Sequence, residues 1–552
     1  TLQKKLSGKS MQKANAIWIR TFSDPRFSVA VVLLAIAARF LQLHFYVDSF
    51  FDTSFQVIAT QNFASGHGIS TAIARVADLG EPVYLPLVNW PPGYSVLLTP
   101  FYLLCGKEYL PACMILEMLS AISIILLCRK ILWQLGTTIA VINLFTLLTA
   151  FFIYYFYYTG STDSIGVAFF LGSITLLLSA LKQKKYPITA VLASAICLLG
   201  AASMKYLFFP VVFVIPVFAF IYGWQNQEAG IRRGATVLFA LVAVGIGGLY
   251  LYQKSISGAG TYISASGRGF FPEHLLRLHP LIPCSFITPN TIRKLPPAGA
   301  STVMNLFRII HIILLLSLTV IAIRSFFRKG LKAASIQRTF IFLSLALALA
   351  ISLVLGVLSL LVDKELIPPD LWWTYVEDAR YYGLADILVQ LVIFMAFSFY
   401  KNQFSGGIRL AIAVLPFLLL PEAARGMVFT FRRVIGFGKE DYYWKTERVF
   451  FNYAKEVVKK KMAVTGSAQT VVTGSLYYAN YRSALYMNAP VLEKPDWLIQ
   501  PQLFRSSKPV ILLAIIGAEQ QKDYQPFIDH PGTELGGQLN GFYFYTLYVA
   551  PR

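Results

Sequence analysis

The feature that most constrains this chain is a series of apolar runs that recurs from residue 27 to residue 424. Each run has roughly the 20 residues that an α-helix needs to cross a hydrocarbon core about 30 Å thick. Only 14% of all residues are charged, whereas about 25% are charged in soluble domains. We therefore predict a polytopic α-helical membrane protein. The eleven predicted spans are residues 27–47, 108–132, 137–157, 162–181, 188–204, 206–223, 234–253, 301–323, 338–362, 380–400 and 407–424.

The basic residues predict how the chain is oriented. The formal net charge is +21, but the lysines and arginines form short clusters between apolar runs. Such clusters are typical of cytoplasmic loops and argue against nucleic-acid binding. They fall on one side if the N-terminus is cytoplasmic, and the lack of Asn-x-Ser/Thr sequons favours a bacterial inner (plasma) membrane. The clusters are Arg129-Lys130, Lys182 with Lys184-Lys185, Arg232-Arg233, Arg324 with Arg328-Lys329 and Lys332, and Lys401 with Arg409.

One apolar segment, residues 91–105, does not fit the count of spans. It opens with two prolines and is too short to cross a bilayer. Counting it as a span would also place every later basic cluster outside. We interpret it as an interfacial or re-entrant helix on the outer leaflet. The outer loops then include residues 48–107, 158–161, 254–300 and 363–379.

Beyond about residue 430 the hydropathy pattern changes. Residues 446–461 have the apolar spacing of a helix, and three later segments have the pattern of apolar strands. We predict a transmembrane domain at residues 1–430 and an extracytoplasmic α/β domain at residues 431–552. Three arginines follow the last span on the predicted outer side, which does not fit the charge rule. The predicted strands are residues 470–475, 509–517 and 541–550, and the arginines are Arg425, Arg432 and Arg433.

Ionisable residues in and beside the spans indicate where a functional site lies, because charges in a membrane are costly and usually functional. On this topology they lie near the middle of their helices or toward the outer ends. A transporter would more often place them at the midplane between related repeats. We therefore predict a polar cavity that opens outward at headgroup depth. The residues are Arg39, Glu117, Lys205, Arg308, His311 and Asp386 within spans, and Asp52, Asp163, Asp378 and Arg380 at helix ends.

Two carboxylates are candidates for acid–base chemistry. Asp52 follows the first span directly and precedes a helical stretch, and Asp163 opens another apolar helix. Either residue could instead only cap the helix that it precedes, since Asp is a favoured cap.

Cationic residues on the same predicted side are candidates for binding phosphate. Lys205 and the pair Arg380-Tyr381 lie beside apolar helices. Lysine and arginine bind phosphate oxygens, and arginine does so in bidentate fashion. The alternative is that each side chain extends to the membrane interface without binding anything.

No metal site is indicated by the histidines or cysteines. His67, His274 and His279 lie in outer loops without H-x-x-x-H spacing, and the five cysteines show no C-x-x-C spacing. The sequence leaves open whether a divalent metal is required.

A set of residues in the first outer loop resembles the C-type (GT-C) glycosyltransferase superfamily, and within it the branch of protein O-mannosyltransferases and the lipid A aminoarabinose transferase. The set is Asp52-Thr53, Ala59, Asn62 and Gly66-His67-Gly68, followed by Trp90-Pro91-Pro92-Gly93-Tyr94. Such proteins place an Asp-Glu pair after the first span, whereas this chain has Thr53 in the second position. Asp163, Lys205-Tyr206 and Arg380-Tyr381 match later positions of the family pattern.

The resemblance implies an enzyme that takes a sugar from a polyprenyl phosphate carrier and passes it to an acceptor outside the membrane, with inversion. The transmembrane domain would then be the catalytic domain. The resemblance implies Asp52 as the base that deprotonates the acceptor, Lys205, Arg380 and Tyr381 at the lipid phosphate, and Asp163 as an orienting residue. Loop 254–300 would close over the donor. This loop carries Arg268, His274, Arg277 and Arg293. The further candidate substrate contacts are His67, Tyr94, Arg268 and Arg293.

Two other functions stay open at this point. One is a ligase or polymerase of surface glycans that uses a polyprenyl-linked donor. The other is a transporter of lipids or solutes. The expected partners of the favoured enzyme are the polyprenyl-phosphate sugar, membrane lipids, and a glycan, lipid or protein acceptor.

Overall fold

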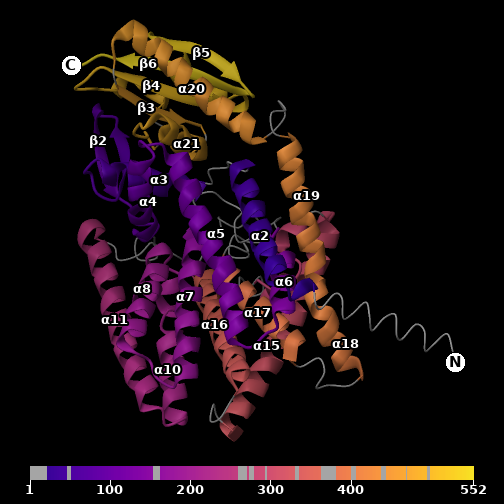
Figure 1. The fold of residues 1–552 in the computed structure, drawn as a ribbon. Helices are drawn as coiled ribbons and strands as arrows, with labels where there is room; N and C mark the ends of the chain where they lie inside the picture. The colour runs from indigo at the N-terminus through magenta and orange to yellow at the C-terminus, as the bar shows by residue number, and fades with distance from the viewer. Residues whose placement is uncertain are drawn as a thin grey trace, which may run out of the picture.

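A computed structural model gives the fold of the chain (Figure 1). It describes residues 21–45, 51–152, 162–258, 270, 272, 279–292, 295–329, 335–361, 381–399, 406–436, 443–467, 469–475, 477–493 and 498–552.

Helices make up the membrane part, and each of the eleven predicted spans overlaps one or more of them. Eight spans of the described residues are long and apolar enough to cross a membrane, and three predicted spans coincide with the shorter apolar helices α6, α8 and α17. The polytopic helical architecture is therefore confirmed. The helices are α2 (Pro25–Phe45), α5 (Tyr109–Gln134), α6 (Ile139–Thr149), α7 (Thr162–Gln183), α8 (Ile188–Met204), α9 (Phe208–Val211), α10 (Val214–Gln225), α11 (Ala229–Ser257), α13 (Leu281–Cys284), α14 (Pro289–Ile292), α15 (Pro297–Lys329), α16 (Ile336–Leu360), α17 (Gly383–Phe399), α18 (Gly406–Val414), η6 (Leu415–Leu419) and α19 (Leu420–Gly436).

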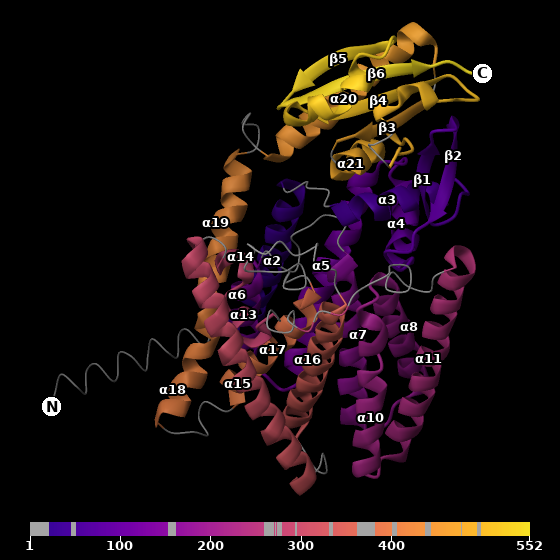
Figure 2. The same cartoon turned by 180° about the vertical axis from the view of Figure 1, so that it is seen from behind.

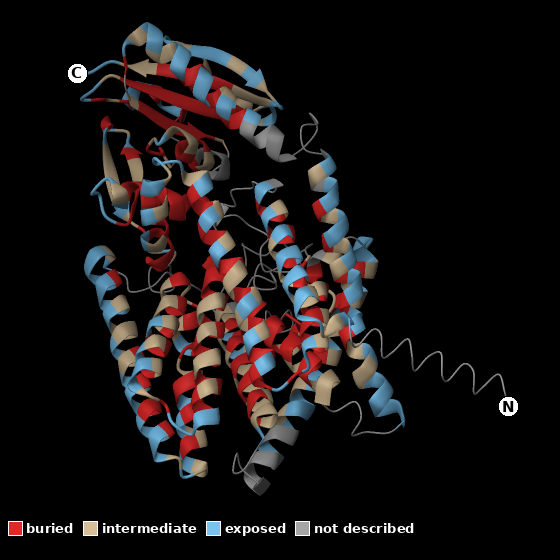
Figure 3. Cartoon of the chain, viewed as in Figure 1, coloured by how far each residue is buried: buried red, intermediate tan, exposed pale blue. Residues whose placement is uncertain are grey.

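Burial separates central helices from peripheral ones. In the most apolar 18-residue stretch of each helix, 72% of the residues are buried within the protein in α7, against 11% in α15. Figure 3 shows the exposed faces of the outer helices, which carry large apolar side chains such as Leu316 and Leu353. Exposed apolar faces of this kind suit contact with lipid. α7 therefore lies at the centre of the bundle, and both of its ends are positioned by neighbouring helices.

The first loop folds into two helices and a β-hairpin beneath the C-terminal domain (Figure 1). α4 (Gly93–Leu104) has only 12 residues, so the segment at 91–105 is a helix too short to span, in agreement with its interpretation as interfacial. The hairpin was not predicted. The other elements are α3 (Phe51–Ala64), β1 (Ser70–Arg75) and β2 (Asp78–Pro86), with β1 antiparallel to β2.

The C-terminal domain is a four-stranded sheet in the order β3-β4-β6-β5, with β3 parallel to β4 and the other pairs antiparallel. The three predicted strands are present, while β5 was not predicted. β4 is buried on both faces, because Leu513 and Ile515 pack against α20 and the alternate residues face a second core. The elements are α20 (Tyr443–Thr465), β3 (Gln469–Gly474), α21 (Tyr477–Met487), η8 (Pro501–Leu503), β4 (Val510–Gly517), η9 (Ala518–Tyr524), α22 (Gln525–Ile528), β5 (Thr533–Leu539) and β6 (Phe542–Val549).

Backbone hydrogen bonds join the hairpin to the C-terminal sheet. Val491 forms parallel bridges with Ile73 of β1 and with Val472 of β3. The Leu79 N–H also donates to the Arg505 carbonyl at 2.8 Å. Figure 2 shows β1 and β2 beside β3 at the same end of the molecule. The C-terminal domain is thus attached directly to the loop that contains α3, the helix on which Asp52 lies.

The two ends of the helical bundle differ in charge. We call the end beneath the C-terminal sheet the sheet end, and the opposite end, where Lys130, Lys182 and Arg232 lie, the basic end. Lys130 and Lys182 both lie over the ring of Trp133, with Nζ at 4.5 and 5.8 Å from its centroid. Lys185 lies against Gly230 at the start of α11. Several of the predicted basic clusters therefore gather at one end.

Candidate functional site

An ion pair at the sheet end of the bundle joins two of the predicted site residues. The Lys205 ammonium contacts the Asp163 carboxylate, and each side chain is only 13% exposed. Asp163 lies in the first turn of α7, and Lys205 follows the last turn of α8 in an extended conformation. α7 and α8 are antiparallel neighbours joined by a short turn, so the start of one lies beside the end of the other.

Tyr381 completes this cluster from a third part of the chain. Lys205 Nζ lies 3.8 Å from the centre of the Tyr381 ring, a cation–π contact. The next residue, Tyr382, is buried and stacks on His279 with ring centroids 3.9 Å apart. The structure thus brings Asp163, Lys205 and Tyr381 together. We call these three residues the Lys205 cluster.

A buried carboxylate lies behind the Lys205 cluster. Ser164, which follows Asp163 on α7, donates a hydrogen bond of 2.7 Å to Glu117 Oε2. Glu117 lies on α5 and is 1% exposed. The sequence flagged Glu117 as a charge within a span but gave it no role at the site. Its signal was an acid in an apolar run, and its partner could be found only from the packing of α5 on α7.

α4 holds the first loop against the end of α8. A Cβ at Gly93 would overlap Ser203 of α8, so only glycine allows the two helices to approach this closely. The Tyr206 hydroxyl donates to the Val88 carbonyl at 2.9 Å, a second connection between the same segments. The Trp-Pro-Pro-Gly-Tyr sequence therefore forms the contact between the first loop and the segment that carries Lys205.

α3 begins close to the same place. Phe55, one turn after Asp52, is buried in one apolar cluster with Ile165 and Met204. Ile165 lies two positions after Asp163, and Met204 directly precedes Lys205. Asp52 itself lies in the first turn of α3, while its side chain is outside the described residues.

Several predicted contacts lie elsewhere or are not described. His67 stacks on Tyr84 in the hairpin, with ring centroids 3.9 Å apart, and is exposed. Tyr94 is fully buried and its hydroxyl lies 3.6 Å from Cys113 Sγ, so Tyr94 packs beneath the loop. The predicted residues that lie outside the described residues are Arg268, His274, Arg277, Arg293, Asp378 and Arg380.

Other charges within helices have structural partners. Arg39 is 1% exposed and donates to the Thr149 and Phe152 carbonyls where α6 ends, which is how a cation stabilises a helix C-terminus. Ser285 donates to Asp386 at 3.0 Å, which joins α17 to the segment after α13. These two charges therefore hold helices together and lie outside the Lys205 cluster.

One of the three arginines that did not fit the predicted topology, Arg425, pairs with a buried carboxylate, Glu422. Glu422 is 3% exposed, accepts a hydrogen bond from the Thr288 N–H at 2.9 Å, and lies 3.6 Å from Arg425. Arg425 also donates to Thr291 of α14. Arg425 is thus paired within the protein, and this group attaches α19 to the part of loop 254–300 that the structure describes.

The Lys205 cluster has the chemistry to hold an anion. An ammonium carries three hydrogen-bond donors, and the side chain of Lys205 keeps 13% of its surface exposed beside Asp163 and the Tyr381 ring. Among the residues that the structure describes, no group of three or more His, Cys, Asp or Glu side chains could hold a metal ion.

Two solved structures of ArnT from Cupriavidus metallidurans are similar to this chain. The structure bound to undecaprenyl phosphate is 12% identical with a TM-score of 0.46, and the apo structure is 13% identical with a TM-score of 0.49. Each comparison covers 94% of this chain and 97% of the other. No family model and no curated protein match the sequence. Because both likenesses are this distant, we infer function from the chain's own residues.

Proposed function

We propose that this protein transfers a sugar from a polyprenyl-phosphate donor to an acceptor hydroxyl at the sheet end of the bundle. The observation that carries the proposal is the Lys205 cluster, which places a cation between a carboxylate and an aromatic ring where the first loop meets α8. The resemblance of that loop to the C-type glycosyltransferases suggests the reaction. A sugar carried on a lipid phosphate needs a cation for its leaving group and a base for its acceptor.

The proposed step is a single inverting displacement. Lys205 binds the donor phosphate, with Arg380 and Tyr381 beside it, and Asp163 holds the ammonium in position. The acceptor oxygen attacks the anomeric carbon and forms the new glycosidic bond. The bond from that carbon to the phosphate oxygen breaks, and the electron pair leaves with the polyprenyl phosphate. The acceptor proton passes to Asp52, the base in this proposal.

We further propose that the sheet end is extracytoplasmic and that the chain resides in a bacterial plasma membrane. The basic end would then face the cytoplasm, in accord with the excess of lysine and arginine in cytoplasmic loops. The C-terminal domain, which is bonded to the first loop, would hold α3 and Asp52 near the membrane surface.

The test uses the purified full chain in nanodiscs with a panel of undecaprenyl-phosphate sugars. Release of undecaprenyl phosphate is followed by mass spectrometry, and a deletion strain supplies the acceptor glycans for comparison. We expect Asp52→Asn and Lys205→Gln to reduce turnover by at least about 100-fold, the usual cost of removing one stabilising group at a reaction centre. Asp523→Asn, which removes an exposed carboxylate from the C-terminal domain, is the matched control and should retain activity.

The outcomes separate this proposal from the other functions. Unimpaired transfer by Asp52→Asn would remove Asp52 from its role. Movement of an intact lipid-linked sugar across the bilayer, without cleavage of its phosphate bond, would instead indicate a transporter. Transfer of a whole lipid-linked oligosaccharide, but not of single sugars, would indicate a ligase of surface glycans.

A further inference from the structure

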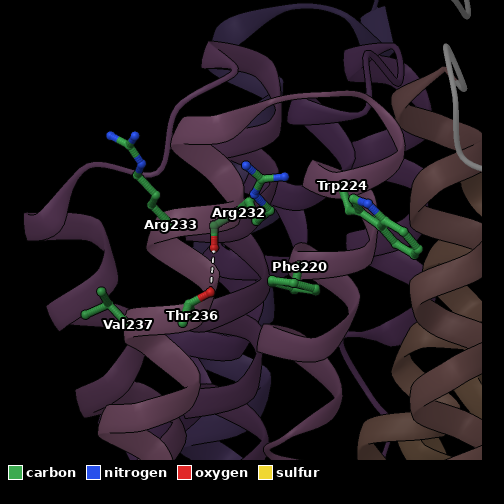
Figure 4. A pocket seen from close by; sticks show the side chains of 6 residues that line it. All are labelled: Phe220, Trp224, Arg232, Arg233, Thr236 and Val237. Carbon is green, nitrogen blue, oxygen red and sulfur yellow. Dashed lines mark hydrogen bonds between the residues drawn. The ribbon is translucent and has the colours of Figure 1, made fainter.

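A second charged feature lies at the basic end, far from the Lys205 cluster. A groove of about 840 Å³ runs along α10 and α11, and Figure 4 shows its side chains. Two aromatic residues of α10 line it on one side, and two arginines and the next turn of α11 line it on the other. The lining residues are Phe220, Trp224, Arg232, Arg233, Thr236 and Val237.

The apolar part of this groove faces outward. Trp224 is 63% exposed, and Phe220 and Val237 are each 41% exposed. Exposed apolar residues on a membrane helix contact acyl chains, and tryptophan is enriched where chains meet headgroups. The groove therefore presents an apolar wall beside a polar end, at the depth where a phospholipid changes from chain to headgroup.

The positive charge of the groove is not neutralised within the described residues. Glu228, the acid nearest in sequence, pairs with Lys184 at 3.5 Å. No carboxylate of a described residue lies within ion-pair distance of Arg232 or Arg233. Lys185 lies against Gly230, two residues before Arg232, and adds a further exposed cation. The N-terminus of α11 contributes partial positive charge at the same place.

The shape of the groove is held by close packing. A Cβ at Gly223 would lie 2.8 Å from the Arg232 backbone nitrogen, so the end of α10 touches the start of α11. Thr236 donates to the Arg232 carbonyl at 3.0 Å, as Figure 4 shows. The backbone that carries both arginines is thus held in place by the packing of α10 on α11.

We propose that this groove binds an anionic glycerophospholipid of the leaflet at the basic end. Arg232 and Arg233 hold the headgroup phosphate, Trp224 lies at the level of the glycerol, and an acyl chain runs along Phe220 and Val237. Two arginines suit a phosphodiester because each guanidinium presents paired donors to its oxygens. A zwitterionic lipid is a poorer ligand, since its own cation repels the arginines. The site is independent of the proposed sugar transfer.

The experiment measures lipid binding to the purified full chain by native mass spectrometry and by the shift in melting temperature. Phosphatidylglycerol and phosphatidylcholine with the same acyl chains are compared. We expect phosphatidylglycerol to bind more tightly, and Arg232→Gln and Arg233→Gln each to weaken it about fivefold, the usual share of one basic residue at a charged membrane surface. Arg324→Gln is the matched control, because it removes one exposed cation from α15 at the same end and outside the groove.

Two further measurements keep the result decisive. Arg232→Lys with Arg233→Lys preserves the charge and should retain more binding than the glutamine variants. Such retained binding would show that substitution at these two positions leaves the fold intact. Glycerol phosphate, the soluble headgroup, should give no shift in melting temperature. Equal binding of the two lipids, equal loss in Arg324→Gln, or a full shift with glycerol phosphate alone would each overturn the proposal.

Discussion

Replacing Lys205 with glutamine changes both the stability of the resting protein and its affinity for a phosphate ligand. Lys205 and Asp163 are each 13% exposed, so the variant removes the Lys205 cation from a carboxylate that is largely shielded from water. Removing one partner of a buried ion pair typically costs about 3–5 kcal/mol. Because glutamine can still donate one hydrogen bond and some exposure remains, we expect about 2–3 kcal/mol here. Asp163→Asn combined with Lys205→Gln removes the carboxylate charge as well and should recover part of this loss.

The ligand response distinguishes a phosphate-binding lysine from a purely structural one. A ligand at 100 times its dissociation constant stabilises the folded protein by about 2.7 kcal/mol. If Lys205→Gln weakens binding 100-fold, the same concentration stabilises the variant by only about 0.4 kcal/mol. The double variant, whose resting stability is partly restored, should show the same small response.

The assay is the melting temperature of the detergent-purified chain with and without undecaprenyl phosphate. Lys254→Gln is the control, since it removes an exposed lysine from the last turn of α11 at the same sheet end. A full ligand response in Lys205→Gln, alongside its lower resting stability, would refute the phosphate-binding role and leave only the structural one.

Three further predictions follow from the same contacts. Gly93→Ala should lower both the melting temperature and the activity, because its Cβ would overlap α8, and the loss of stability should be about 1–3 kcal/mol. Gly247→Ala, in an open part of α11, is the control and should be neutral or stabilising. Equal effects of the two substitutions would contradict the close-packing argument. Glu117→Gln keeps the shape but changes the acceptor for Ser164, and we expect turnover to fall with little change in donor KM; an unchanged turnover would assign Glu117 to stability alone. Slight burial raises the pKa of Asp78, but hydrogen bonds from the Ser507 and Gly80 N–H groups outweigh it and leave the pKa below its usual 3.8. This contribution to stability is present above pH 3.8 and is lost as the pH falls through the lowered pKa, so limited proteolysis of the hairpin should increase there in the parent but not further in Asp78→Asn.

The C-terminal domain is bonded to the loop that contains α3 and Asp52. Its sheet is bonded through Val491 and Arg505 to the hairpin that follows α3. Neither β1 nor β2 was predicted, because short strands containing Gly80, Pro82 and Ala74 carry little strand propensity of their own. Two isolated strands are marginally stable in water, so this hairpin depends on the partner that the distant end of the chain supplies.

The sequence alone was sufficient for the helices. A backbone within lipid must satisfy its own hydrogen bonds, which favours helices, and all eleven predicted spans overlap helices. The short α4 was readable for the same reason, since 12 residues cannot cross the bilayer. The candidate residues Asp163 and Lys205 could also be identified from the sequence, because a charged residue beside an apolar run costs free energy and is usually functional.

Only the tertiary structure decided which of these charges meet. Lys205 contacts Asp163 and Tyr381 because α8 ends where α7 and α17 begin. That arrangement depends on side-chain packing over the whole bundle. The same packing gave Arg39 and Arg425 structural partners, although their positions in the sequence look equally functional. Membrane insertion is determined residue by residue along the chain, whereas the helix contacts that build a site join residues far apart in it.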